Sequence, residues 1–318
     1  MRLTRSTALL SFVLVLLASG CSRAPDRPAS VPSGSVPASA AHYPLTLTDD
    51  EGQKLTLQHA PMRIVTFAPA VTEIVYALGL GSRVVGVSGS YDDYPAAAKK
   101  VEEVGGAGDF GVDPNLEKVV SLQPDLFLTI SGGDEWKAKL RDLGVPVFTI
   151  QATTLEDTIH DIRTVGTLTG ATAAAGRVAA SMEQQARAVE ARVAGVAPVS
   201  CFYEVYYGPP IDTVGPGSFV YDLLQKAGCD PVTSSAKTAY PRWSAEALLS
   251  ENPDVYLVDS LSAPNAAAVA KRPGFDALSA VRDGSVDMID SDLVTRQGPR
   301  VVLGLSELAR ALHPDAFA

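Results

Sequence analysis

The chain has 318 residues, of which 46% are hydrophobic and 19% charged, and it carries a formal net charge of −10 with a pI near 4.9. This length suits two lobes, each large enough to bury a core of its own. The acidic balance excludes a nucleic-acid partner, because no basic stripe is available to neutralise phosphates.

The N-terminus has the composition of an export signal. Two arginines precede an apolar run over residues 8–18, which is too short to span a membrane and predicts a signal peptide over residues 1–20. The stretch LLASGC is typical of a lipoprotein processing site, at which Cys21 becomes the lipid-bearing N-terminus; ordinary signal-peptidase cleavage near Ala18 is the alternative. We therefore expect an exported lipoprotein, anchored through Cys21 on the periplasmic or cell-surface side of the membrane.

Residues 21–42 are rich in Pro, Ser and Ala and predict a flexible tether. The first lobe, expected over residues 43–152, opens with a hairpin signal at Asp49-Asp50-Glu51-Gly52. Apolar strands and amphipathic helices then alternate, with strands expected at 63–68, 83–88, 125–130 and 145–150 and helices at 71–80, 115–123 and 134–144. Such alternation predicts a mainly parallel sheet covered on both faces.

Residues 153–196 are rich in Ala and contain few helix breakers apart from Thr169-Gly170-Ala171-Thr172. A helix of about forty residues would span roughly 60 Å, which exceeds one small lobe. We therefore expect one long rigid helix that connects two lobes.

The alternation resumes in a second lobe, expected over residues 197–318, with strands at 200–207, 254–259 and 285–290, helices at 217–228, 244–251 and 298–312, and a broken helix around 268–281. The stretch SAEALLSENPDVYL (244–257) repeats the pattern of NLEKVVSLQPDLFL (115–128), in which a helix cap, an early Glu, a Pro-Asp stop and an apolar strand follow one another. The predicted fold class is α/β, with two lobes that each contain a mainly parallel sheet flanked by helices.

Glu117 and Glu246 fall in the first turns of these two equivalent helices. A carboxylate there is favoured by the helix dipole and by free N–H groups, so helix stabilisation alone explains each one. Two equivalent carboxylates also suit docking on a symmetric partner that bears paired basic residues. The residues alone leave both interpretations open.

Cys201 and Cys229 are candidates for a disulfide, because an exported chain meets an oxidising compartment. Cys201 opens a predicted strand, and Cys229 closes the helix that returns to the same end of the sheet. A disulfide requires a short Cα separation, which a sequence does not supply, so whether this bridge forms stays open. The cysteine spacing has no zinc-site pattern, and no metal site is expected.

Aromatic residues gather in loops expected at the carboxyl ends of strands, where α/β proteins bind ligands. They are Tyr91, Phe110, Trp136, Tyr206, Tyr207, Tyr240 and Trp243. Such rings suit a flat macrocycle with a polar rim, although about half of them are expected to pack under their own loops. Arg242 and Arg296 lie in similar loops, where an arginine is either solvated or meets phosphate or carboxylate groups.

The residues argue against catalysis. The chain has no nucleophile elbow, phosphate-cradling loop, dinucleotide fingerprint or metal-ligand spacing, and Asp92-Asp93 before Tyr-Pro is typical of a turn. An adhesin or structural lipoprotein would explain the tether but not the aromatic loops. A ligand-binding protein without a cofactor is expected.

Five stretches, in this order, resemble the substrate-binding proteins of ABC importers for cobalamin, ferric siderophores and haem: TFAPAVTEIVYALGL, VVGVSGSYDDYP, NLEKVVSLQPDLFL, YPRWSAEALLSENPDVYL and SDLVTRQGPRVVL. The resemblance runs from about Met62 to about Leu312. It implies the class III periplasmic-binding-protein architecture, in which two α/β lobes joined by a rigid helix hold the ligand in a cleft. It also implies that Glu117 and Glu246 pair with arginines of an ABC permease dimer, which works with its ATPase subunits. A monomer is expected.

Within that family, the DYP and YPRWSAE stretches look most like the cobalamin-binding members, which implies corrin contacts at Tyr91 and Tyr240, and next at Phe110. One departure is Ile130, which stands where those members have Trp, and whether Trp136 substitutes for it stays open. Haem and a ferric siderophore are the alternative ligands. The histidines, His42, His59, His160 and His313, lie outside the expected cleft loops. This disfavours His-ligated haem, whereas ligation by Tyr91, Tyr206 or Tyr240 stays open.

Overall fold

A computed structural model describes residues 42–105 and 113–318, all of which belong to one compact unit, Ala38–Ala318. The expected signal peptide, all but the last residue of the expected tether, Cys21 and Phe110 lie outside the described residues. Among the helices of the described ranges, none is long and apolar enough to cross a membrane.

The first lobe begins with the expected hairpin, in which β1 (Leu45–Thr48) pairs antiparallel with β2 (Lys54–Leu57). The turn is held by the Asp49 carboxylate, whose Oδ1 accepts hydrogen bonds from the backbone N–H groups of Glu51 and Gln53 at 3.1 and 2.7 Å. An Asx-type turn of this kind lets a polar side chain replace a backbone partner.

The first-lobe sheet runs in the order β4-β3-β5-β6, and its neighbouring strands are all parallel. Its strands are β3 (Ile64–Phe67), β4 (Val84–Val87), β5 (Leu126–Ile130) and β6 (Val147–Ile150), and its helices are α1 (Pro69–Ala77), α2 (Leu116–Ser121) and α3 (Asp134–Asp142). Ile64 packs into one apolar cluster and the next residue, Val65, into another. Both faces of the sheet are therefore covered, as the continuous apolar strands predict.

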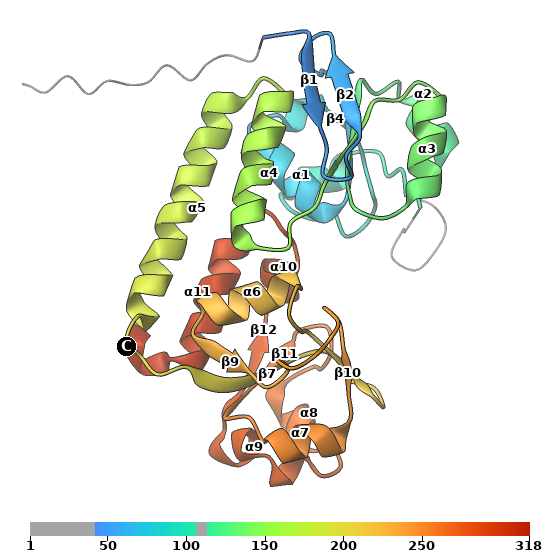
Figure 1. Cartoon of the computed structure of the whole chain (residues 1–318). Coiled ribbons are helices and arrows are strands. Elements are labelled where there is room, and N and C mark those ends of the chain that lie inside the picture. Colours follow the sequence, from blue (N-terminus) through green and yellow to red (C-terminus); the bar gives the residue numbers. More distant parts are fainter. Residues whose placement is uncertain (1–41, 106–112) are drawn as a thin grey trace, which may run out of the picture. The chain divides into compact units, whose positions relative to one another are not determined.

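The prediction of one continuous helix over residues 153–196 is wrong. Two helices, α4 (Leu155–Leu168) and α5 (Thr172–Val193), lie side by side and antiparallel (Figure 1). The chain reverses at Gly170, which has a left-handed φ of 74°. The helices approach so closely that a Cβ built on Gly166 would lie 2.2 Å from the Cβ of Ala175. The long connecting helix is α5 alone, with 22 residues.

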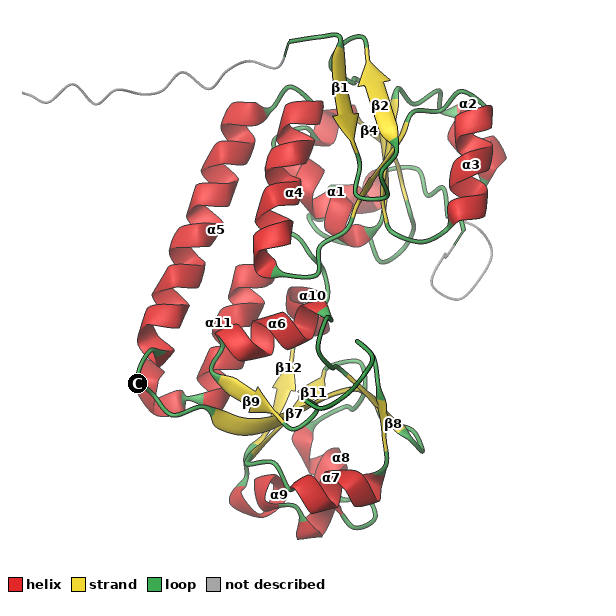
Figure 2. Ribbon diagram, in the orientation of Figure 1, coloured by secondary structure: helices red, strands yellow, loops and turns green. Residues whose placement is uncertain are grey.

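The second-lobe sheet has the order β10-β8-β7-β11-β12, with β9 beside the first half of β7 (Figure 2). Its strands are β7 (Val199–Tyr206), β8 (Ile211–Thr213), β9 (Cys229–Pro231), β10 (Arg242–Trp243), β11 (Val255–Asp259) and β12 (Val286–Ile289). Its helices are α6 (Phe219–Lys226), α7 (Ala245–Glu251), α8 (Ala266–Ala270), α9 (Ser279–Asp283), α10 (Ser291–Val294) and α11 (Val301–Leu312). The sheet is mainly parallel, since β9, β11 and β12 run with β7 while β8 and β10 form an antiparallel edge. The α/β fold class is therefore confirmed; the sequence patterns missed β8, β9, β10 and α10, which are too short to show a period.

The duplicated unit recurs as α2–β5 and α7–β11. Asn115 Oδ1 accepts a hydrogen bond from the N–H of Lys118 at 3.0 Å, and Ser244 Oγ accepts one from the N–H of Ala247 at 3.1 Å, so both predicted caps are present. The two helices also finish alike, because Gln123 and Asn252, each just before Pro-Asp, both have a φ of 46°. A left-handed residue followed by proline stops a helix, and the strand then begins.

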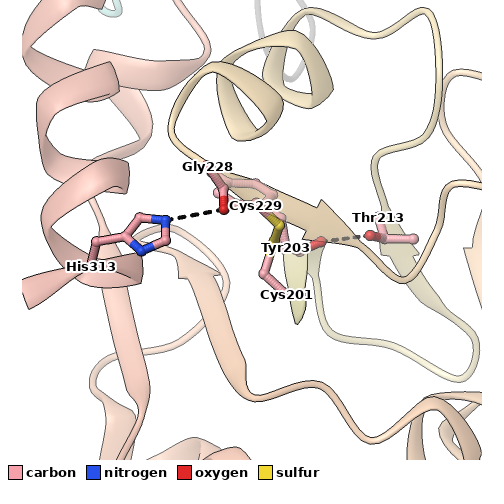
Figure 3. Close-up of a disulfide and its surroundings, with 6 residues drawn as sticks. All are labelled: Cys201, Tyr203, Thr213, Gly228, Cys229 and His313. Atoms are coloured by element: carbon pink, nitrogen blue, oxygen red, sulfur yellow. Dashed lines mark hydrogen bonds between the residues drawn. A yellow bond between two sulfur atoms is a disulfide. The ribbon is translucent and has the colours of Figure 1, made fainter. Parts of the chain in front are cut away.

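The disulfide that the sequence left open is present (Figure 3). Cys201 of β7 and Cys229 of β9 are bonded, with their Cα atoms 5.9 Å apart. Both side chains are buried, and the ring of His313 lies against the carbonyl oxygen of Gly228, with a distance of 3.1 Å from Nε2. The bridge therefore ties the start of β7 to the strand beside it.

Removing this disulfide should destabilise the protein. The bridge spans a sequence separation of 28, and closing a loop of this length in the unfolded chain stabilises the fold by about 3–4 kcal/mol. We expect the Cys201→Ala/Cys229→Ala variant to show this loss in urea denaturation, and a reducing agent to affect the wild type but not the variant. An unchanged free energy of unfolding would contradict the expectation.

Candidate ligand-binding cleft

A cavity of about 370 Å³ lies at the carboxyl ends of the first-lobe strands. Its walls come from the end of β3, the end of β4, the end of β5 and the first turn of α3, through residues that include Phe67, Ser88, Thr129, Ile130 and Trp136. Gly132 and Gly133, which also line it, have φ values of 89° and 76°, so the turn after β5 folds back in a conformation that suits glycine. Parallel sheets bind ligands at this end.

A second, smaller cavity of about 60 Å³ adjoins the first, because Ile130 and Ser131 line both. Gln297, which follows α10 in the second lobe, contributes to its wall, as does Asp161 of α4. The small cavity therefore lies where the two lobes and the connecting helices meet.

Three of the predicted ligand-binding tyrosines are exposed. Tyr91, three residues beyond the cavity-lining Ser88, is 48% exposed, Tyr206 at the end of β7 is 59% exposed, and Tyr240 is 67% exposed. Large aromatic side chains are usually buried, so exposed rings in strand-end loops are candidates for contact with a ligand.

Trp136 has a different environment, since it is buried against Phe67 and Phe127, with ring centroids 5.4 and 5.7 Å away. Its indole forms part of the wall of the large cavity. Its Nε1–H has no hydrogen-bond partner among the described residues. Trp136 therefore belongs to the core of the first lobe and also borders the candidate site.

Tyr207 and Trp243 pack against the core of the second lobe. The guanidinium of Arg272 lies 3.8 Å from the centroid of the Tyr207 ring and also pairs with the buried carboxylate of Glu204. These two aromatics, like the buried Trp136, pack beneath their own loops, as was expected of about half of the set.

The two predicted arginines are both engaged in ion pairs. Arg242 lies in the edge strand β10, not in a loop as the sequence indicated, and its Nε donates to Asp212 Oδ1 at 2.9 Å. Arg296 is largely buried and bridges the lobes: its Nη1 donates to Asp93 at 2.8 Å, and its Nη2 lies 2.6 Å from Asp292. In this structure Arg296 holds the lobes together and leaves little guanidinium surface for a ligand.

The sequence patterns missed the rest of this interlobe network. Glu73 of α1, only 3% exposed, accepts two hydrogen bonds from Arg300, at 2.9 and 2.5 Å, and the Arg300 guanidinium lies 3.9 Å from the centroid of the Tyr94 ring. A bidentate carboxylate–guanidinium pair is among the stronger charged contacts. The four-residue spacing of Asp292, Arg296 and Arg300 was a visible signal, but Glu73 is 227 positions away from Arg300.

The Asp92-Asp93 pair serves structure, as the turn interpretation predicted for it. Asp92 is buried and accepts hydrogen bonds from Thr72, Ser88 and the N–H of Gly89. Burial raises the pKa of the Asp92 carboxyl, and these hydrogen bonds oppose the rise. For Asp93, burial is the largest influence but is outweighed by the hydrogen bond and charge of Arg296, so its pKa is lowered.

Glu117 and Glu246 are both exposed in the first turns of α2 and α7. Neither forms an ion pair with another described residue at hydrogen-bonding distance. The pKa of Glu246 is lowered by hydrogen bonds from its own backbone N–H and then from Ser244. Both carboxylates thus lie in the first turn of a helix, and both face solvent.

Within the described ranges, no group of three or more His, Cys, Asp or Glu side chains is arranged to hold a metal ion. His59 and His160 are exposed, and His313 lies against Gly228, away from the cavities at the strand ends.

The fold and this cleft define a solute-binding protein with two lobes. A family model described as "Periplasmic binding protein" matches residues 64–293, and this chain belongs to that family, whose relatives serve ABC transporters as binding components. The resemblance inferred from the motifs is thereby confirmed at the level of the family.

Known relatives differ in what their names say they bind. The chain is 34% identical, over 98% of its length and 97% of the relative, to an uncharacterized ABC transporter substrate-binding lipoprotein, YvrC, of Bacillus subtilis. It is 30% identical to a cobalamin-binding protein of Halobacterium salinarum, over 86% of this chain and 75% of that one. A solved structure of the periplasmic haem-binding protein RhuT of Roseiflexus superposes with a TM-score of 0.70 at 26% identity, over 80% of this chain and 98% of that one.

Proposed function

We propose that this protein is an extracytoplasmic lipoprotein that captures cobalamin, or a related corrinoid, in the cleft and delivers it to an ABC import permease. The observation that carries the proposal is the cavity of about 370 Å³ at the strand ends, which is walled by Phe67, Ile130 and Trp136 and lies beside the exposed Tyr91 loop. Its lining is largely apolar with a few polar groups, which is the usual make-up of a small-molecule site.

Cobalamin is favoured as cargo because it is a flat macrocycle whose faces suit aromatic rings and whose rim suits polar groups. The relative that is named for cobalamin binding supports this choice. Tyr91 and Tyr206 are proposed as contacts from the first and second lobe, with Tyr240 as a third. Cys21 is proposed as the lipid attachment site, and Glu117 and Glu246 as the contacts with the permease.

A direct binding experiment tests the cargo. We expect cyanocobalamin to quench the intrinsic Trp and Tyr fluorescence of the purified protein saturably, with cobinamide next, and hemin or a ferric siderophore to bind much more weakly. Tyr91→Ala should weaken cyanocobalamin binding by about tenfold, because a stacked ring loses both buried area and its π contact.

Tyr94→Ala is the matched control, since Tyr94 lies in the same loop and is 47% exposed but stacks on Arg300. It should leave the affinity for cyanocobalamin within about threefold of the wild type. Saturable quenching by hemin alone would replace cobalamin by haem as the cargo, and no quenching by any of the four probes would refute the binding function.

A further inference from the structure

A buried carboxyl group that lines the small cavity has one oxygen without a partner. Asp161, in the middle of α4, is 3% exposed, and its Oδ2 accepts no hydrogen bond from any described residue. Its carboxyl is hydrogen-bonded to that of Asp50, from the turn between β1 and β2, and Asp50 Oδ2 accepts a hydrogen bond from the N–H of Gln151 at 2.7 Å. Buried polar atoms are nearly always satisfied, so a free acceptor here points to a missing partner.

The charged groups around Asp161 are acidic. Burial has the largest influence, and the charges of Asp50 and of Asp157, one turn earlier on α4, add to it, so that the pKa of Asp161 rises to about 8. At neutral pH the Asp161 carboxyl therefore holds a proton. Acidic side chains grouped in this way offer oxygen acceptors and disfavour an anion beside them.

The Asp161 side chain lines a space of suitable size. Asp161, Ser131, Gln151 and Gln297 line the cavity of about 60 Å³, which is large enough for one small polar group and too small for a ring. Ser131 also lines the large cavity. A side arm on a molecule held in the large cavity can therefore reach the acceptor.

We propose that this small cavity is a subsite for a primary amide arm of the cargo, whose NH₂ group donates a hydrogen bond to Asp161 Oδ2 while its carbonyl accepts from Ser131 or a neighbouring glutamine. The inference rests on the proposed function and deepens it. An N–H donor suits the site better than a metal ion, because no metal-holding cluster occurs among the described residues. Corrinoids carry such amides around their rim, whereas haem carries carboxylates.

The test compares cyanocobalamin with its monocarboxylic acids, in each of which one rim amide is replaced by a carboxylate. By calorimetry at neutral pH, the wild type should bind at least one of these acids at least tenfold more weakly than cyanocobalamin, because a second anion would face the carboxyl pair. Asp161→Asn keeps the side-chain volume and a hydrogen-bond acceptor but removes the acid. In this variant the affinity for cyanocobalamin should be nearly unchanged, and the monocarboxylic acid should bind no more than about threefold more weakly than cyanocobalamin.

Glu156→Gln is the matched control, because Glu156 lies on the same helix but is exposed and pairs with Lys226 instead of lining the cavity. It should keep the discrimination of the wild type. Equal binding of all the acids by the wild type, or unchanged discrimination in Asp161→Asn, overturns the subsite.

These binding experiments distinguish a failure of the subsite from a failure of the proposed cargo. If cyanocobalamin binds but its acids are not discriminated, only the subsite is wrong. If cyanocobalamin fails to bind while hemin binds, the proposed cargo and the amide subsite are both wrong, because haem carries carboxylates and no amide. If no probe binds, the proposed function and the subsite fall together.

Discussion

Reversing the charges of Glu117 and Glu246 together, as Glu117→Arg with Glu246→Arg, is expected to reduce uptake of labelled cyanocobalamin at least tenfold and to leave its binding unchanged. Both side chains are exposed at the starts of equivalent helices, and neither lines a cleft cavity. If they face basic residues of a permease dimer, reversal turns two attractions into two repulsions, and like charges across an interface suppress docking. Uptake is measured in cells that lack the wild-type copy, and binding by calorimetry.

The matched control for this pair is Glu135→Arg with Glu251→Arg. It makes the same change in net charge at one exposed glutamate in each lobe, in the first turn of α3 and at the end of α7. Uptake by this variant should stay close to the wild type. Normal uptake by the Glu117/Glu246 variant would show that these residues serve only to stabilise their helices.

The second large effect concerns the pH dependence of stability. Since the pKa of Asp161 is raised to about 8 by burial and by its acidic neighbours, the folded state binds a proton that the unfolded state has already lost at neutral pH. The stability that this proton contributes is complete below the unfolded pKa, near 4, and is lost as the pH rises towards 8. Between pH 5 and pH 8 the wild type should therefore lose up to about 4 kcal/mol relative to Asp161→Asn, which does not titrate there.

Urea denaturation at pH 5, 6.5 and 8 measures this difference. Glu135→Gln is a control for which the pH dependence of stability should have the opposite sign. A hydrogen bond from Lys139 lowers the pKa of this exposed carboxyl. Removing the Glu135 charge should therefore be slightly destabilising at neutral pH and without effect in acid. A constant difference between wild type and Asp161→Asn across the pH series would show that Asp161 is not protonated in the folded protein.

Local pattern predicted much of the fold because helix caps and Pro-Asp stops act within a few residues. Asn115 and Ser244 cap their helices as expected. The left-handed residues Gln123 and Asn252 end the two helices in the same way, so the duplicated sequence pattern corresponds to a duplicated structure. The continuous helix over residues 153–196 failed because the reversal at Gly170 depends on close packing between Gly166 and Ala175, which no local period reveals.

The candidate site also combines features that the local sequence predicts with features that depend on tertiary packing. The strand-end position of Tyr91 follows from alternating strands and helices, whereas the burial of Trp136 between Phe67 and Phe127 follows from tertiary packing. Arg296 could be placed near the cleft from its motif. The contact of Arg296 with Asp93, 203 positions away in the chain, could not be predicted from that motif.

The sequence by itself therefore determined the two lobes and the equivalent positions of Glu117 and Glu246, because both depend on short-range order repeated along the chain, and its motifs carried the family resemblance that indicated the class of protein. Only the tertiary structure decided which polar groups meet. It paired Glu73 with Arg300 and set Asp161 beside Asp50, leaving one oxygen without a partner. The physical reason is that burial and charge pairing depend on distance in space, and these partners lie more than a hundred positions apart in the chain.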